Sequence, residues 1–337
     1  MTLKPVGRLA ALLMTAGVIL TACSSSGSSS APASGAPASA APASAAPASA
    51  AAGGKVTLGV AFPNSDTFLS RVQDGMKAEA TAKGAEIVIT DAKDDTAAQL
   101  SQVENFVSQK VSAIVVVPVD TSAAQPMADA AKAANIPIVF VNRNPSIADV
   151  PYVGSDSLFA GTVEMEELAK LAGGKGDVVI LEGQVSNEAA VLRTQGCNDV
   201  VGKNPGMKVV ATQAGDWDRA KGQSITENWI QSGLLKAGMV VCANNDEMGL
   251  GAINALKAAN LLDSVFVGGV DATSEALAAM QAGDLEVTVF QDAKGQGKGG
   301  VDAAVDLVDG KTIAGNLVDI PYVLVTPANI QDYLGAN

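Results

Sequence analysis

Polar side chains that could bind hydroxyl groups follow several apolar stretches of this chain. The clearest case is the apolar run 239–243, which leads directly into Asn244-Asn245-Asp246 and then into a helical pattern. Amides and carboxylates form hydrogen bonds in several directions, so such a sequence can hold a polyhydroxylated ligand. In a parallel α/β sheet, the carboxyl ends of the strands open into the ligand crevice. The pattern therefore predicts a binding site at these strand ends.

The same order of apolar strand, polar tip and helix recurs along the chain. Taken alone, each tip is more simply explained as a helix cap or a solvated turn. Their recurrence favours one cleft between two facing sheets. Two aromatic residues stand among them, and an aromatic face packs well on the C–H face of a sugar-like ring. The tips are 64–68 with Asp66 and Phe68, Asn142-Arg143, Arg193, 216–219 with Trp217, Asn245-Asp246, Asp271 and Gln291.

Strands and helices alternate from residue 55 onward, with short connections. We expect strands at 56–62, 85–90, 113–117, 136–141 and 152–154, and helices at 67–82, 96–109, 121–134 (with Thr121 as N-cap) and 157–171. A second series follows, with strands at 177–181, 207–212, 239–243, 265–270 and 285–290, and helices at 187–202, 217–231, 274–281 and 296–308. Nearly continuous apolar strands between amphipathic helices indicate parallel sheets covered on both faces. The predicted fold is α/β, with two similar lobes.

The first 54 residues have the composition of a leader and a tether. Residues 1–22 combine a basic start, a short apolar run and small residues, which is the pattern of a signal peptide. Leu20-Thr21-Ala22-Cys23 resembles the lipobox of bacterial lipoproteins, in which Cys23 is acylated; the alternative is an ordinary cleaved signal with an incidental cysteine. Residues 23–54 are almost wholly Ser, Ala, Pro and Gly and predict a disordered tether. We therefore expect an exported protein anchored by lipid to the cell membrane.

Charge and composition exclude several classes of function. The formal net charge of −13 becomes −15 without residues 1–22, which hold two basic residues and no acid, and this acidity argues against nucleic acid as a partner. The chain has no histidine, which excludes His-based general acid–base catalysis, Ser-His-Asp triads and His-ligated metals. Besides Cys23 there are only Cys197 and Cys242, too few for a zinc cage. They could form a disulfide in an exported protein or be two small buried residues, and the sequence leaves both readings open.

The sequence fits two other classes of protein, NAD-dependent enzymes and repressors, less well. The segment Gly295-Gln-Gly-Lys-Gly-Gly300 fits the G-x-G-x-x-G motif of NAD-dependent enzymes, but it follows the last strand of the pattern. No second strand ending in Asp or Glu comes about 20 residues later, as dinucleotide binding requires. A repressor would need a DNA-binding headpiece where this chain has a leader and a tether. A lipoprotein that supplies ligand to a membrane sensor remains an alternative to one that supplies a transporter.

From residue 55 to its end, the sequence resembles bacterial sugar-binding proteins of the ribose/galactose-binding type, which deliver ligand to ABC importers. The motifs behind the resemblance are Ser-Asp-Thr-Phe-Leu at 65–69 with Asp74-Gly75, Asn142-Arg143, Val153-Gly-Ser-Asp156, Arg193 before Gly196, Trp217-Asp218, Ala-Asn-Asn-Asp-Glu-Met at 243–248, Gly269-Val-Asp271 and Val289-Phe-Gln291. The resemblance implies the two-lobed type I periplasmic-binding-protein fold, without catalysis, cofactor or bound metal. It nominates as ligand contacts Asp66, Phe68, Asn142, Arg143, Arg193, Trp217, Asn245, Asp271 and Gln291.

The resemblance also implies a domain organisation and a ligand class. Chains of this family cross between lobes three times, here near 155–156, 291–292 and 320–321. This implies an N-terminal lobe of 55–155 plus 292–320 and a C-terminal lobe of 156–291 plus 321–337. Galactose-binding relatives carry a calcium loop and a His and an Asp just before the matching arginine, where this chain has Asn187 and Ala189. Segments 187–194 and 142–145 look more like the cyclitol branch, which binds inositol or rhizopine. We expect a monomer that captures a polyol or sugar by hinge closure and delivers it to an ABC permease.

Overall fold

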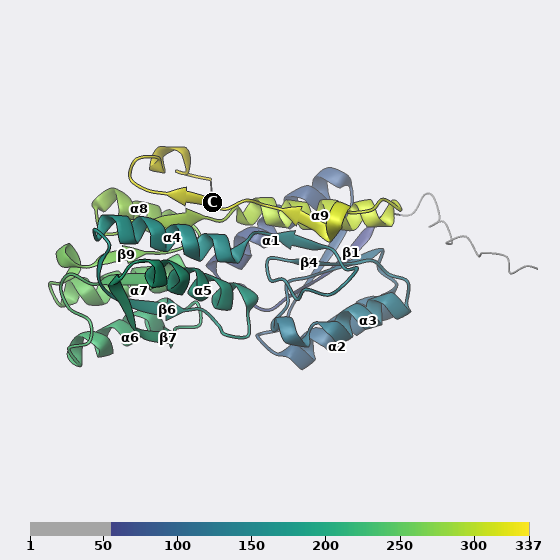
Figure 1. Ribbon diagram of the computed structural model, residues 1–337. Coiled ribbons are helices and arrows are strands. Elements are labelled where there is room, and N and C mark those ends of the chain that lie inside the picture. The colour runs from purple at the N-terminus through teal and green to yellow at the C-terminus, as the bar shows by residue number, and fades with distance from the viewer. Residues whose placement is uncertain (1–54, 337) are drawn as a thin grey trace, which may run out of the picture. The chain divides into compact units, whose positions relative to one another are not determined.

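The computed structural model describes residues 55–336. The predicted leader 1–22, the lipidation site Cys23 and the tether 23–54 lie outside the described residues. Among the described helices, none combines the length and the apolar character needed to cross a membrane. Residues 55–336 form two lobes, each built on a parallel sheet flanked by helices (Figure 1). The predicted α/β fold with two lobes is confirmed.

The first lobe contains a six-stranded parallel sheet with helices on both faces. The strand order is β11-β5-β4-β3-β1-β2. Its strands are β1 (Thr57–Phe62), β2 (Glu86–Asp91), β3 (Ala113–Val116), β4 (Ile138–Val141), β5 (Tyr152–Gly154) and β11 (Leu317–Asp319). Its helices are α1 (Thr67–Lys83), α2 (Thr96–Gln109), α3 (Gln125–Ala133) and α9 (Ala293–Val308), with the short 3-10 helices η1 (Thr121–Ala123) and η3 (Ala314–Asn316).

Alternation along the strands of this sheet supplies two cores. In β3, Val115 packs with α1 and α9, whereas Ile114 and Val116 pack on the opposite face with α2 and α3. Because successive strand side chains point to opposite faces, a strand covered on both faces is apolar at every position. The parallel strands place all their carboxyl ends at one edge of the sheet, where the polar tips begin.

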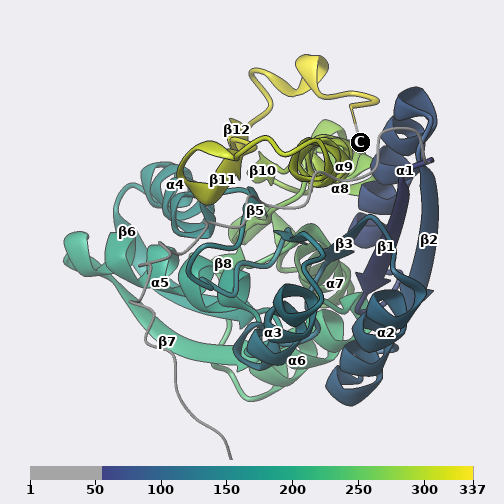
Figure 2. The ribbon, with the colours of Figure 1, turned by 90° about the vertical axis from the view of Figure 1, so that its right-hand side faces the viewer.

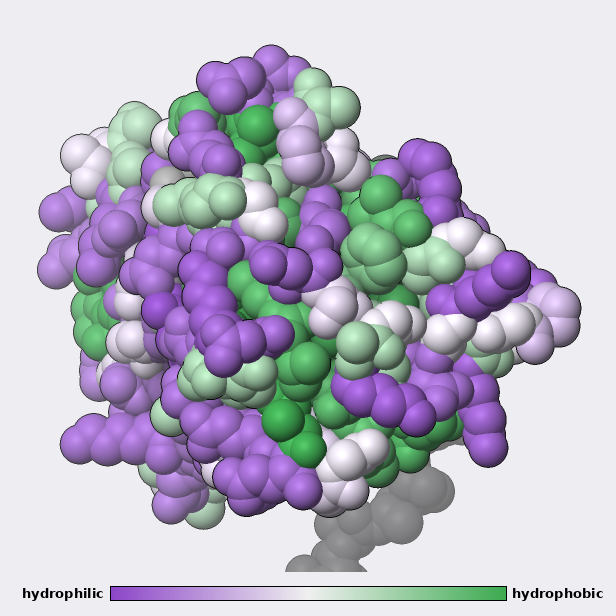
Figure 3. Space-filling view, turned by 90° about the vertical axis from the view of Figure 1, so that its left-hand side faces the viewer, coloured by the Kyte–Doolittle hydropathy of each residue, from purple (hydrophilic) through white to green (hydrophobic). Residues whose placement is uncertain are grey.

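The second lobe repeats this arrangement with a shorter sheet. The order is β7-β6-β8-β9, formed by β6 (Lys175–Glu182), β7 (Gly206–Ala214), β8 (Val240–Ala243) and β9 (Phe266–Gly268). Beside it, β10 (Thr288–Phe290) pairs antiparallel with β12 (Val323–Val325). The helices are α4 (Ser157–Leu171), α5 (Glu188–Lys203), α6 (Arg219–Gln231), α7 (Asp246–Ala258) and α8 (Ser274–Ala282), with η2 (Leu262–Ser264) and η4 (Ile330–Asp332). The end of this lobe shown in Figure 3 is largely hydrophilic, with hydrophobic strips between the polar side chains.

The chain changes sheets in three places. It leaves the first sheet after β5, returns from β10 to α9, and leaves again between β11 and β12. Although α9 is late in the sequence, it packs against α1 in the first lobe, as the views in Figures 1 and 2 agree. Residues distant in the sequence therefore meet where the segments between the lobes lie.

The G-x-G-x-x-G match at 295–300 is explained by helix packing. The expectation that no strand ending in Asp or Glu follows about 20 residues later is wrong, because β11 ends at Asp319. The segment lies inside α9, and a Cβ on Gly297 would lie 2.1 Å from the carbonyl oxygen of Val72 in α1. A Cβ on Gly300 would similarly collide with Val141 of β4, at 2.7 Å. The glycines therefore allow α9 to approach α1 and the sheet closely.

Three predicted helix starts are wrong, for local reasons. The helix predicted from residue 296 begins at Ala293, because Asp292 caps α9 through the N–H of Gly295. Thr121 does not cap a helix over 121–134, because Asp120 caps the short η1 and α3 begins separately at Gln125 with Pro126 in its first turn. Proline lacks an N–H and is favoured at the start of a helix. The helix predicted from Trp217 begins at Arg219, because Trp217 adopts a left-handed conformation with φ of 67° and Asp218 caps α6.

Cys197 and Cys242 form a disulfide bond. Cys197 lies in α5 and Cys242 in β8, and both are fully buried in the core between these elements. The disulfide therefore ties α5, which carries Arg193, to the strand that ends at Asn244-Asn245.

Candidate functional site

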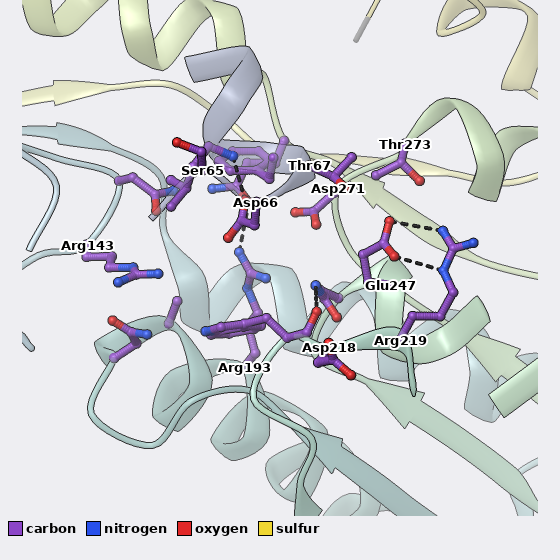
Figure 4. A pocket seen from close by; sticks show the side chains of 18 residues that line it. Ser65, Asp66, Thr67, Arg143, Arg193, Asp218, Arg219, Glu247, Asp271 and Thr273 are labelled. Carbon is purple, nitrogen blue, oxygen red and sulfur yellow. Dashed lines mark hydrogen bonds and ion pairs between the residues drawn. The ribbon is translucent and has the colours of Figure 1, made fainter. Parts of the chain in front are cut away.

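A cavity of about 350 Å³ lies at the carboxyl ends of the strands and is lined by both lobes. Figure 4 shows Asp66 and Arg143 of the first lobe and Arg193 and Asp271 of the second around the same space. All the residues nominated from the sequence line this cavity: Asp66, Phe68, Asn142, Arg143, Arg193, Trp217, Asn245, Asp271 and Gln291. The fold thus brings together residues that are more than 200 positions apart.

Asp66 is both a helix cap and part of the cavity wall. Its Oδ1 accepts a hydrogen bond of 2.7 Å from the backbone N–H of Leu69, so Asp66 caps α1. Removing this cap would lower the free energy of unfolding by about 0.5–2 kcal/mol. Burial raises the pKa of Asp66, while this N–H and the guanidinium of Arg143 act in the opposite direction. Phe68 follows in the first turn of α1 and adds an aromatic surface.

Arg143 brings an almost fully buried guanidinium to the first-lobe side. Its Nη1 donates to the carbonyl oxygen of Pro118, at 2.9 Å, beyond the end of β3. Burial lowers the pKa of Arg143, and the charge of Asp66 opposes this. A carboxylate and a guanidinium therefore face the cavity from one lobe, supplying both an acceptor and donors for hydroxyl groups.

Arg193 is the most highly connected side chain of the second-lobe wall. Its Nη1 donates to the carbonyl oxygen of Asn244 at 2.6 Å, and its Nη2 donates to Gln291 Oε1 at 2.9 Å and to the Tyr322 hydroxyl at 2.6 Å. The guanidinium also lies 5.6 Å from the ring centroids of both Trp217 and Tyr322, within cation–π range. Arg193 is thus oriented by α5, by the tip after β8 and by two segments between the lobes.

Trp217 supplies a large aromatic surface beside Arg193. Its indole lies close to the backbone of Gly183, where a Cβ would come within 2.1 Å of the ring. Because only glycine leaves this space, Gly183 at the end of β6 allows the ring to take its position. A flat aromatic surface next to a guanidinium suits a ring with one apolar and one hydroxylated side.

The tip Asn244-Asn245-Asp246 has three different roles. Asn244 is turned into the scaffold, and its Oδ1 accepts from the Gly183 N–H at 3.1 Å and from the Thr194 hydroxyl at 3.0 Å. Asn245 lines the cavity and caps α7 through the N–H of Met248. Asp246 is buried behind the wall. Of the three residues, only Asn245 reaches the ligand space.

Asp271 and Gln291 complete the second-lobe wall and are both nearly fully buried. Asp271 has φ of 123°, a strained conformation for a residue with a side chain, and pairs by a β-bridge with Phe290. Burial raises the pKa of Asp271 well above its ordinary value, and the guanidinium of Arg193 counteracts this effect. Backbone strain at a cavity-lining carboxylate is typical of a functional position.

Asp246 should make stability depend on pH. Burial raises its pKa to about 7 although Thr288 and Thr273 donate hydrogen bonds to it, both at 2.7 Å. An acid whose pKa is higher in the folded state favours folding while protonated, so its contribution falls as pH rises from about 4 to about 7, by up to about 1.4 kcal/mol per pH unit. Urea unfolding from pH 4.5 to 8 should show this component in the wild type and not in Asp246→Asn. Identical pH profiles for the two proteins would contradict the assignment. Burial also raises the pKa of Glu286 to about 7, so the pH dependence that Glu286 contributes should remain in both proteins.

A cluster of charges stands at the side of the cavity. Arg219 donates to both carboxylate oxygens of Glu247, at 2.8 and 3.0 Å (Figure 4). It also forms an ion pair with Glu275. Its positive charge is therefore already paired within the second lobe, unlike that of Arg143, whose hydrogen bonds go to backbone carbonyls. Sequence reasoning placed Arg219 among the tips but did not nominate it.

Hydrogen bonds among the described residues join the lobes beside the cavity. Arg71 of α1 donates to the Ser274 hydroxyl at 3.3 Å. The Thr121 hydroxyl donates to the Ser186 carbonyl at 3.2 Å, and the backbone N–H of Asn144 donates to Glu188 at 3.4 Å. These contacts hold the lobes together without using the residues that face the ligand space.

Sequence reasoning missed several residues of the wall. Ser65, Thr67, Asn187, Asp218, Arg219, Glu247 and Thr273 also line the cavity. Most of them are next to a nominated residue in the sequence. Their position in a polar segment after a strand was therefore the signal that could have identified them. Tyr322, which receives a hydrogen bond from Arg193, follows the third crossing and had no local signal. Within residues 55–336, the only cluster of potential metal ligands is Glu164 with Cys197 and Cys242, whose sulfurs are joined in the disulfide.

Comparison with known proteins gives a consistent group of relatives. Residues 58–312 match the model of a periplasmic binding protein domain. A Rhizobium meliloti protein named as a rhizopine-binding protein is 43% identical over 281 residues, which cover 81% of this chain and 90% of the relative. A xylitol-binding protein of Mycolicibacterium smegmatis is 34% identical over 276 residues, covering 82% of this chain and 77% of that protein.

A solved structure shares both the fold and much of the sequence. An ABC transporter solute-binding protein from Bacillus halodurans, with bound myo-inositol, is 42% identical and superposes with a TM-score of 0.81. The match covers 84% of this chain and 99% of the solved chain.

Proposed function

The chain belongs to the periplasmic binding protein domain family, within the ribose/galactose-binding type and its inositol branch, and we propose that it captures a neutral cyclitol of the inositol class. The observation that carries the proposal is the cavity between the lobes, with three guanidiniums, four carboxylates, amides and an indole around it. The likeness to a myo-inositol-bound protein supports this ligand class. The protein binds its ligand and does not convert it.

The balance of charges favours a neutral polyol over a charged ligand. Asp66 and Arg143 face the cavity from the first lobe, and Asp271 and Arg193 from the second. Arg143 interacts electrostatically with Asp66, Arg193 with Asp271 and Arg219 with Glu247, so an added anion or cation would lack a partner of its own. Burying an unpaired charge is costly, whereas a hydroxyl can donate to a carboxylate and accept from a guanidinium at once. A six-membered ring with hydroxyls around its edge can use both lobes.

Closure of the lobes should supply the selectivity. We propose a hinge formed by the crossings near 155–156, 291–292 and 320–321, between lobes of 55–155 plus 292–320 and 156–291 plus 321–337. A ligand that contacts both lobes favours the closed form. Closure removes water, so a missing or misplaced hydroxyl leaves a buried polar group unpaired, which costs about 1–3 kcal/mol.

The cellular role follows from the family and from the first 54 residues. We propose that Cys23 is lipidated, that 23–54 tethers the protein outside the cytoplasmic membrane, and that the monomer delivers its ligand to an ABC permease. The lipobox-like sequence at 20–23 and the Ala/Pro/Ser composition after it support this. Metabolic labelling with a palmitate analogue should mark the wild type and not Cys23→Ala; equal labelling of both would overturn the anchoring.

A thermal-unfolding panel tests the ligand class. The panel holds myo-inositol, scyllo-inositol, glucose, galactose, ribose, xylose and xylitol. A ligand that binds only the folded state must raise the unfolding midpoint, by an amount that grows with its concentration over Kd. We expect the largest rise with a cyclitol. A rise confined to a sugar would change the ligand class, and no rise with any compound would refute the proposal.

Trp217 should report binding directly. The chain has only two tryptophans, of which Trp217 lines the cavity and Trp229 is buried in the second-lobe core. A ring bound against Trp217 changes the surroundings of its indole, so the cyclitol should alter the intrinsic fluorescence. Trp217→Phe should lose this change, and the matched variant Trp229→Phe should keep it. A ligand signal that disappears with Trp229 instead would place the ligand elsewhere.

A further inference from the structure

Gln296 is a fully buried glutamine that does not line the cavity but contacts a residue that does. It lies in the first turns of α9, just past the second crossing between the lobes. Its Oε1 accepts a hydrogen bond of 3.0 Å from Asn142 Nδ2, and its own Nε2 donates to the Ser155 hydroxyl at 3.0 Å. Ser155 belongs to the first crossing. Gln296 thus connects a wall residue to the segments between the lobes.

The backbone of Asn142 is also fixed in position by hydrogen bonding. The residue has φ of 67°, in the left-handed region, and its carbonyl oxygen accepts a hydrogen bond of 2.9 Å from the Tyr152 hydroxyl. The Tyr152 ring lies over Gly154, where a Cβ would come within 2.0 Å of the hydroxyl oxygen. The Gly154 carbonyl in turn accepts from the N–H of Ile320, at 2.7 Å, at the third crossing. Elements from all three crossings therefore meet around Asn142.

We propose that Gln296 is a positioning residue that sets the orientation of the Asn142 carboxamide for the ligand, and this inference rests on the proposed function. With Nδ2 donating to Gln296, Asn142 presents Oδ1 as the acceptor for a ligand hydroxyl. In a fraction of molecules, a freely rotating carboxamide would present Nδ2 to the ligand instead of Oδ1. Restricting it to one orientation on binding would cost free energy and so weaken affinity. Because Gln296 also holds Ser155, the orientation of this ligand contact depends on how the segments between the lobes are placed.

Calorimetric titration of the purified protein with the cyclitol tests this inference through a double-mutant cycle. Gln296→Met keeps the volume and removes both hydrogen bonds, and it should raise Kd roughly 5- to 30-fold. Asn142→Gly suits the left-handed backbone and removes the carboxamide. If Gln296 acts through Asn142, then Gln296→Met should change Kd less than about twofold in the Asn142→Gly background. An equal loss in both backgrounds, or no loss in the wild-type background, would overturn the proposal.

A matched control and a ligand-free measurement complete the test. Gln102 of the same lobe also makes two hydrogen bonds, to Thr90 and to the Asp91 carbonyl, outside the cavity. Gln102→Met should leave Kd unchanged. In NMR spectra without ligand, the Asn142 side-chain amide signals should shift and lose exchange protection in Gln296→Met but not in Gln102→Met. Unchanged Asn142 signals in Gln296→Met would refute the positioning role, whether or not the wild type binds a cyclitol. Absence of cyclitol binding in the wild type would refute only the proposed function.

Discussion

Replacing Arg193 with methionine should weaken cyclitol binding by roughly 30- to 5,000-fold, or about 2–5 kcal/mol, because it removes a charged hydrogen-bond donor from the cavity and leaves its buried polar partners unpaired, at about 1–3 kcal/mol each. The guanidinium orients Gln291 and Tyr322 and stacks on Trp217, so its loss removes a contact and disorders three others. Methionine keeps the packing between the two aromatic rings. Calorimetric titration would measure Kd, with circular dichroism to verify the fold.

Arg219 provides the matched control for Arg193. It also lines the cavity, but its charge is paired with Glu247 and Glu275 within the second lobe. Partly exposed ion pairs contribute little, so Arg219→Met should change Kd by less than about fivefold. Retained affinity in Arg193→Met, or equal losses in the two variants, would show that Arg193 is not the organising residue of the site.

Removing the disulfide should produce the largest loss of stability. Cys197 and Cys242 are separated by 45 residues, and closing a loop of this length in the unfolded chain is worth about 4 kcal/mol in the chain-entropy model. The double variant Cys197→Ala/Cys242→Ala should therefore unfold roughly 8–16 °C lower, which calorimetry can measure. Both positions are buried in the second-lobe core, where alanine fits without overpacking.

The same double variant separates stability from binding. Neither cysteine lines the cavity, so Kd for the cyclitol should stay within about threefold of the wild type at temperatures where both proteins are folded. Wild-type protein refolded under reducing conditions should have the same melting temperature as the double variant. An unchanged melting temperature in the double variant would contradict the stabilising role of the disulfide.

The architecture was predictable because it rests on local patterns. Apolar runs such as 113–117 are typical of strands covered on both faces, and the amphipathic segments between them indicate helices. The cavity wall was predictable for the same reason, since parallel strands bring their polar tips to one edge. The predicted family resemblance is confirmed by relatives more than 40% identical.

What could not be predicted depends on long-range geometry. β11 and β12 are three-residue strands, too short to show a period, and they are fixed only by their partners in the two lobes. Tyr322 meets Arg193 across 129 positions because the third crossing returns there. The choice of Asn245 over Asn244 as the wall residue depends on contacts of Asn244 with Gly183 and Thr194, which no local pattern reveals.

Isothermal titration of the purified protein with myo-inositol measures directly whether the cavity binds a cyclitol. We predict saturable binding with one site per chain, competition by other cyclitols, and a Kd raised at least about 30-fold in Arg193→Met but not in Arg219→Met. No saturable heat with any cyclitol, or an unchanged Kd in Arg193→Met, would contradict the claim that this cavity holds a neutral cyclitol.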